Sequence, residues 1–157
     1  MHMSKSRTFP VPVEEAFDRL LPMPLEALFT RWCGPIPPVR STEQNGIWGT
    51  AGQQRVVRFV GPGSVRETLV RVDPPHEFSY ELSEPTGPLA LIVARVQGRW
   101  VFEPAGTGVR ITWSWDVEPC NRAAHQALPA FARFWRAYAR GALDGLEGIL
   151  LSSQESM

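Results

Sequence analysis

The chain has 157 residues, the size of one domain whose core needs no covalent cross-links. Lysine plus arginine equals aspartate plus glutamate at 16 each, and this balance argues against nucleic acid or an anionic membrane surface as a partner. Cys33 and Cys120 lie in different segments, without a paired spacing or a companion histidine. We therefore expect no disulfide, no metal site and no cofactor.

No apolar run approaches the roughly 18 residues that a membrane span requires, and the chain does not open on a charged and then apolar leader. These features predict a soluble, cytoplasmic protein without a membrane span, either a monomer or a homodimer. We expect a single domain over residues 4–151, with 152–157 as a candidate disordered tail.

The first part of the chain predicts a strand followed by two short helices. Ser4–Val11 is typical of a strand. Val13–Leu21 has apolar residues at helical spacing and two glutamates in its first turn, where they complement the helix dipole. Pro22 and Pro24 end that helix, and Leu25–Phe29 predicts a second short one.

Glycine- and proline-rich turns then separate runs that are rich in valine, threonine and aromatic residues. The runs predict six further strands: Val39–Glu43, Gln53–Val60, Ser64–Val72, Glu77–Ser83, Leu91–Glu103 and Val109–Glu118. Because the connections are mostly tight turns, we expect the strands to be antiparallel.

The segment Arg122–Leu151 predicts a long amphipathic helix. Its apolar residues, among them Phe131, Trp135 and Tyr138, recur at steps of three and four. Pro129 lies inside the pattern, so the helix either begins there or is kinked there. The elements together predict an α+β protein, a seven-stranded curved antiparallel sheet around a long C-terminal helix, with an apolar cavity between them.

Several segments carry a family resemblance: the opening Val11–Phe17, the turn Val72–Tyr80, the strand segments Gly98–Trp100 and Gly108–Trp113, and the aromatic pair Phe134–Trp135. With this order of elements, the chain resembles the START/Bet v 1-like (SRPBCC) superfamily and its polyketide cyclase/dehydrase-like branch. The resemblance implies a helix-grip fold whose cavity binds lipids, polyketides, sterols or aromatic metabolites. It implies no reaction, since the branch has no universal catalytic signature.

The turns at 61–63 and 73–76 predict one shared inward face of the sheet. The expected neighbours are Phe59 with Val65, Val57 with Glu67, Arg55 with Leu69, Tyr80 with Leu69, and Leu82 with Glu67. Val70 and Val72 favour the opposite face, so a β-bulge in this strand could turn Glu67 outward.

Arg55 and Glu67 are the charged exceptions on this face, expected as diagonal neighbours. A buried charge must be paired or must titrate. Two interpretations follow. The pair either holds the polar end of a ligand or does acid–base work, or it is an ion pair in the cavity wall or an exposed pair at the cavity mouth.

The last hairpin places tryptophans on the inner face. Its expected pairs are Phe102 with Val109, Trp100 with Ile111, Gly98 with Trp113, and Val96 with Trp115. Gly98 would then leave room for the Trp113 indole. We expect Trp113 and Trp115 to fill the core, and Trp100 and Tyr80 to line the cavity, where Tyr80 offers a hydroxyl.

Three functions are consistent with this pattern. The first is binding of a small apolar or amphipathic molecule. The predicted ligand-binding residues are Arg55, Val57, Phe59, Glu67, Leu69, Tyr80, Leu82, Trp100, Phe131 and Trp135. The second is a cyclase or dehydratase for a polyketide-like or aromatic substrate, with Glu67 as base, Tyr80 as proton donor or oxyanion partner, and Arg55 stabilising an enolate. The third is an interaction domain with a residual cavity.

Overall fold

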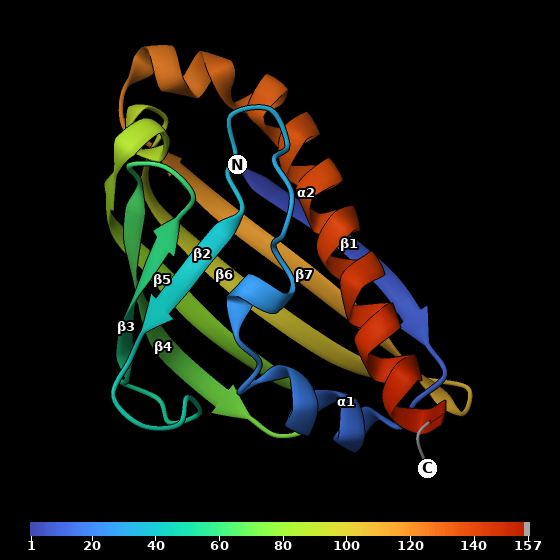
Figure 1. Cartoon of the computed structure of the whole chain (residues 1–157). Helices are drawn as coiled ribbons and strands as arrows, with labels where there is room; N and C mark the ends of the chain where they lie inside the picture. Colours follow the sequence, from blue (N-terminus) through green and yellow to red (C-terminus); the bar gives the residue numbers. More distant parts are fainter. Residues whose placement is uncertain (156–157) are drawn as a thin grey trace.

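The computed structural model describes residues 1–155, which form one curved antiparallel sheet and the helices that cover its concave face (Figure 1). The strand order is β1-β7-β6-β5-β4-β3-β2. The strands are β1 (His2–Phe9), β2 (Val39–Glu43), β3 (Gln54–Phe59), β4 (Ser64–Asp73), β5 (Glu77–Thr86), β6 (Val93–Ala105) and β7 (Gly108–Pro119). The helices are α1 (Val13–Leu20), the 3-10 turns η1 (Leu25–Ala27) and η2 (Gly87–Leu91), and α2 (Arg122–Glu155). The predicted fold class is confirmed.

The long helix α2 begins at Arg122, where the Asn121 side chain accepts a hydrogen bond from the Ala124 N–H at 2.8 Å. Pro129 therefore lies inside the helix, and Figure 1 shows α2 changing direction after its first turns. Its buried Trp135 packs on Trp113 of β7, with ring centroids 4.8 Å apart. No helix in the described part of the chain has the length and apolar character to cross a membrane.

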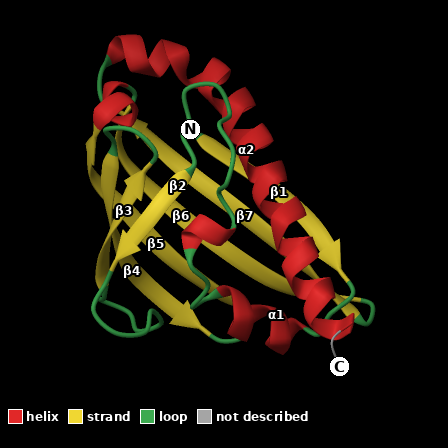
Figure 2. Cartoon of the chain, viewed as in Figure 1, coloured by secondary structure: helices red, strands yellow, loops and turns green. Residues whose placement is uncertain are grey.

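The ends and the short helices differ from the sequence-based prediction. Strand β1 starts at His2, which pairs with Asp116 of β7. The second short helix is only one 3-10 turn, and η2 was not predicted. At the C-terminal end α2 runs on to Glu155, and residues 156–157 of the predicted tail lie outside the described residues. Figure 2 shows α1, η1 and the loop after them crossing the open side of the sheet.

Two hairpin registers differ from the prediction by two residues. The β3–β4 hairpin closes at Phe59 and Gly63, so Arg55 lies directly opposite Glu67. The β6–β7 hairpin closes with the two-residue turn 106–107, so Trp100 lies opposite Trp113. Because side chains alternate with a period of two, an error of two residues leaves every side chain on its predicted face.

The β4–β5 register is as predicted, with Leu69 opposite Tyr80 and Glu67 opposite Leu82. The β4–β5 pairing has two register shifts, one between Ser64 and Arg66 and one between Leu69 and Arg71. The second is the β-bulge that leaves Val70 exposed. It lets Leu69 and Val72 both pack toward the core although three residues separate them. The bulge therefore explains the conflicting pattern of this strand without turning Glu67 outward.

Candidate ligand-binding site

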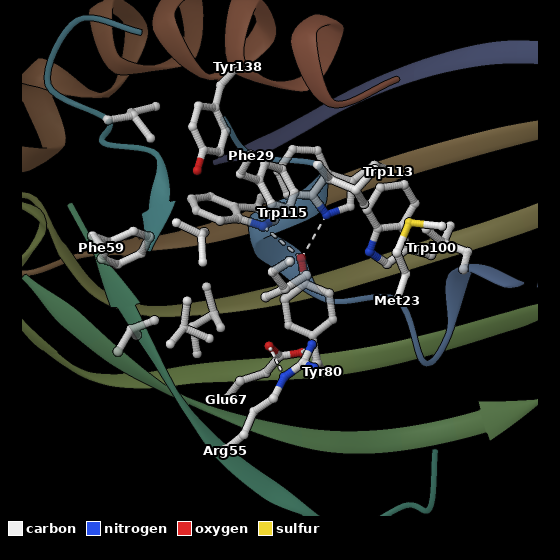
Figure 3. A pocket seen from close by; sticks show the side chains of 18 of the residues that line it. Met23, Phe29, Arg55, Phe59, Glu67, Tyr80, Trp100, Trp113, Trp115 and Tyr138 are labelled. Atoms are coloured by element: carbon white, nitrogen blue, oxygen red, sulfur yellow. Dashed lines mark hydrogen bonds and ion pairs between the residues drawn. The ribbon is translucent and has the colours of Figure 1, made fainter. Parts of the chain in front are cut away.

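A largely apolar cavity lies between the concave face of the sheet and the segment that runs from the end of α1 to β2 (Figure 3). Its lining residues are Leu20, Leu21, Met23, Leu25, Leu28, Phe29, Ile36, Pro37, Val39, Arg55, Val57, Phe59, Val65, Glu67, Phe78, Tyr80, Leu82, Leu89, Trp100, Trp113, Trp115 and Tyr138. The cavity has a volume of about 50 Å³. That is room for a few waters, so a larger ligand must displace part of the wall.

The wall that can yield is the short segment between α1 and β2. Leu21, Met23 and Leu25 are only partly buried, whereas the strand residues that line the cavity are buried. Side chains at the partly exposed rim lose few contacts when they move. Leu21, Met23 and Leu25 are therefore the part of the wall that a ligand can displace at the lowest cost in packing.

Arg55 and Glu67 form a bidentate ion pair in the cavity wall, joined by two hydrogen bonds. Arg55 Nε lies 3.0 Å from Glu67 Oε1, and Nη2 lies 3.3 Å from Oε2. The side chains are only 3% and 4% exposed. The third guanidinium nitrogen donates to Gln44 at 3.2 Å, and the guanidinium carbon lies 4.1 Å from the centre of the Trp48 ring. The pair is therefore buried and internally satisfied, and it does not lie exposed at a mouth.

The protonation of Glu67 depends on two opposing effects. Burial raises the pKa of the Glu67 carboxyl, while the charge and the hydrogen bonds of Arg55 oppose that rise. Both carboxylate oxygens already accept hydrogen bonds from Arg55. Each oxygen keeps a second lone pair, so these two bonds do not have to break before Glu67 takes a proton from a substrate.

The Tyr80 hydroxyl forms two hydrogen bonds inside the cavity. Its oxygen accepts hydrogen bonds from the indole N–H groups of Trp113 at 2.7 Å and Trp115 at 3.0 Å. Burial, and next the negative charge of Glu67, raise the pKa of Tyr80, so the phenol keeps its proton. Gly98 lies opposite Tyr80 on β6, and a Cβ there would collide with the Tyr80 ring. The glycine thus makes room for Tyr80 and not, as predicted, for Trp113.

The second buried hydroxyl belongs to Tyr138 of α2. It donates a hydrogen bond to the Pro37 carbonyl at 3.0 Å, and the Tyr138 ring stacks on Phe29 with centroids 5.0 Å apart. Burial raises the pKa of Tyr138. Tyr138 thereby ties the long helix to the segment that covers the cavity.

The predicted site residues divide into two groups. Those that line the cavity are Arg55, Val57, Phe59, Glu67, Tyr80, Leu82 and Trp100. Leu69, Phe131 and Trp135 are buried but do not line it. Trp135 packs on Trp113 and Trp115, which do line the cavity although we expected them only to fill the core.

Residues 20–39 supply a wall of the cavity that was not predicted from the sequence. These residues include Leu20, Leu21, Met23, Leu25, Leu28, Phe29, Ile36, Pro37 and Val39. Proline interrupts this segment repeatedly, so its apolar side chains follow neither helical nor strand spacing. The inward position of Tyr138 was predictable, because this residue belongs to the apolar stripe predicted for the long helix.

A curved antiparallel sheet, a long C-terminal helix and an apolar cavity between them define a helix-grip, Bet v 1-like protein. The chain belongs to the family described as polyketide cyclase/dehydrase and lipid transport, whose model matches residues 1–150. The family resemblance seen in the sequence is therefore confirmed. No curated protein sequence is similar enough to the chain to count as a match.

Solved structures show the same fold. A protein of Thermus thermophilus is 22% identical, with a TM-score of 0.69 over 98% of this chain and 99% of that chain. The major latex-like protein 151 of Panax ginseng is 12% identical, with a TM-score of 0.70 over 94% and 95%. Ara h 8.0201 is 21% identical, with a TM-score of 0.65 over 97% and 98%. At these identities the likeness concerns the fold alone.

Proposed function

We propose that the protein binds one small apolar or amphipathic molecule, such as a lipid, a polyketide or an aromatic metabolite, in the cavity. The observation that carries this proposal is the composition of the wall, which is aliphatic and aromatic except for a few buried polar groups. Such a wall takes up an apolar body from water and leaves the polar groups to orient it. Membership of a family described by polyketide chemistry and lipid transport supports the same function.

A pair of valines on β4 provides the test. Val65 lines the cavity and is buried, whereas Val70 on the same strand is exposed. Val65→Phe should fill the cavity and greatly weaken binding of the fluorescent probe 1-aminoanthracene. Val70→Phe adds the same atoms outside and should leave binding unchanged. Equal affinities of the wild type, V65F and V70F would place the probe elsewhere and contradict the proposal.

A second candidate function is that of a cyclase or dehydratase. It is favoured by one observation, that Glu67, Arg55 and Tyr80 line the same cavity while burial raises the pKa of Glu67. In this mechanism Glu67 removes a proton from a carbon next to a carbonyl, Arg55 stabilises the enolate, and Tyr80 donates a proton to the departing oxygen, which leaves as water. Once Glu67 has taken up the proton it is neutral, and its electrostatic attraction to Arg55 is lost. The proton held by Glu67 then returns to Tyr80 and restores both groups.

Heptane-2,6-dione is a simple substrate for that mechanism, because its internal aldol condensation joins two of its own carbons and releases one water. A catalytic Glu67 should accelerate the reaction by about 10²–10⁴-fold over buffer. Glu67→Gln should abolish that acceleration while 1-aminoanthracene still binds. A rate equal to that in buffer would contradict the enzymatic function and leave binding standing. Failure to bind any apolar probe would favour an interaction domain with a residual cavity.

A further inference from the structure

The hydroxyl proton of Tyr80 has no acceptor among the described residues. An indole N–H can only donate, so the bonds from Trp113 and Trp115 occupy the acceptor capacity of the phenol oxygen. No described carbonyl or side chain accepts a hydrogen bond from the Tyr80 hydroxyl proton. Figure 3 shows the hydroxyl pointing from the sheet into the cavity, toward the two indoles.

The second hydroxyl of the cavity and the guanidinium group of Arg55 already donate hydrogen bonds to the protein, whereas no hydrogen bond joins the indole N–H of Trp100, which also lines the cavity, to a described residue. The proton of Tyr138 is donated to the Pro37 carbonyl, which can only accept. All three guanidinium nitrogens of Arg55 donate to Glu67 or to Gln44. Tyr80 is thus the one hydroxyl in the described cavity wall whose proton has no protein acceptor.

We propose that the ligand presents a neutral carbonyl oxygen to the Tyr80 hydroxyl, which selects apolar molecules that carry a ketone or a similar acceptor. This inference rests on the proposed binding function and narrows its ligand class. A buried donor without an acceptor is costly, and a ligand carbonyl removes that cost. The two hydrogen bonds that Tyr80 accepts also polarise its hydroxyl and strengthen it as a donor.

The surroundings favour a neutral acceptor over a carboxylate. Apart from the Arg55–Glu67 pair, the wall near Tyr80 is made of aromatic and aliphatic side chains. A free carboxylate in such a place would lose its hydration without gaining a positive partner, because Glu67 already neutralises Arg55. A neutral carbonyl costs far less to desolvate and still satisfies the donor.

Acetophenone and α-methylstyrene provide the test, since they share one shape and differ in C=O against C=CH₂. We compare the ratio of their two affinities among variants, so that their different solubilities in water cancel. Tyr80→Phe should lower the acetophenone-to-α-methylstyrene affinity ratio about threefold to tenfold. Tyr138→Phe, the matched control, also alters the cavity wall, but it should change the two affinities by the same factor because the Tyr138 proton is donated to Pro37 and not to the ligand.

The infrared band of the acetophenone carbonyl supplies a second measurement. In the wild-type complex the carbonyl band should lie at lower frequency than in an alkane solvent. In Y80F the band frequency should change, even if the indole N–H of Trp113 or Trp115, which no longer donates to Tyr80, donates to the ligand instead. An unchanged affinity ratio together with an unchanged band in Y80F would overturn the inference. If Y80F does not fold, a wild-type band at the alkane frequency overturns it.

Different results contradict the inference about Tyr80 and the proposed binding function. If α-methylstyrene binds in the cavity but the affinity ratio and the carbonyl band are both unchanged in Y80F, only the inference about Tyr80 is wrong. If neither probe binds, nor 1-aminoanthracene, the proposed binding function is wrong as well.

Discussion

Breaking the ion pair between Arg55 and Glu67 should destabilise the protein strongly, because removing either residue leaves the buried charge of the other without a partner. The pair has two hydrogen bonds and is almost fully buried. Removing one partner of such a pair costs about 3–5 kcal/mol of unfolding free energy. We therefore expect Glu67→Gln and Arg55→Met each to cost an amount in that range, measured by denaturant unfolding.

The double variant separates the pair from the other contacts of Arg55. With both charges gone, the double variant should lose less than either single variant, so the two substitutions should be coupled by at least about 3 kcal/mol. The matched control is the pair of Arg66 with Glu84, which also joins neighbouring strands but lies on the surface, with side chains 42% and 69% exposed. R66M and E84Q should show a coupling of about 1 kcal/mol or less. Additive losses for the inner pair would refute the account of a buried, mutually dependent pair.

Three further predictions test the packing around the cavity. Trp135→Ala should cost about 3–5 kcal/mol in denaturant unfolding because the indole is fully buried, and a loss of a few tenths would contradict that burial. Gly98→Ala should cost about 1–3 kcal/mol, since its Cβ collides with the Tyr80 ring, and near-neutral stability would place that ring elsewhere. Tyr80 and Tyr138 are the only tyrosines, and both have raised pKa values, so their stabilising effect is complete below the unfolded pKa of about 10 and is lost as the pH rises above it. Tyrosinate absorbance should then appear only together with unfolding, and a rise near pH 10 with unchanged circular dichroism would contradict this.

The order of the elements could be predicted from the sequence because their patterns are local. Turn residues, alternating strands and the amphipathic stripe of α2 each fix an element without knowledge of its neighbours. The inward position of Arg55 and Glu67 was also predictable, although the register was wrong by two residues. The alternation of side chains along a strand decides which face each one occupies. The partner on the neighbouring strand depends on which residues form the hydrogen bond that closes the turn.

The contents of the cavity wall could be predicted only in part. The segment from α1 to β2 has no periodic pattern, so the sequence did not show that Met23 or Phe29 would face the sheet. The roles of Trp113 and Trp115 depend on the position of the Tyr80 hydroxyl, which Gly98 on the neighbouring strand makes possible. Such three-strand arrangements depend on register and side-chain direction together, and neither is encoded in a single strand.

The binding of an apolar ligand in the cavity can be tested most directly from the indole N–H signals in an NMR spectrum. Trp113 and Trp115 line the cavity, while the exposed Trp32 borders a separate surface hollow between its loop and α2. Titration with acetophenone should shift the indole signals of Trp113 and Trp115, and it should leave that of Trp32 in place. A shift of Trp32 alone would place the ligand in the outer hollow and contradict binding inside the sheet.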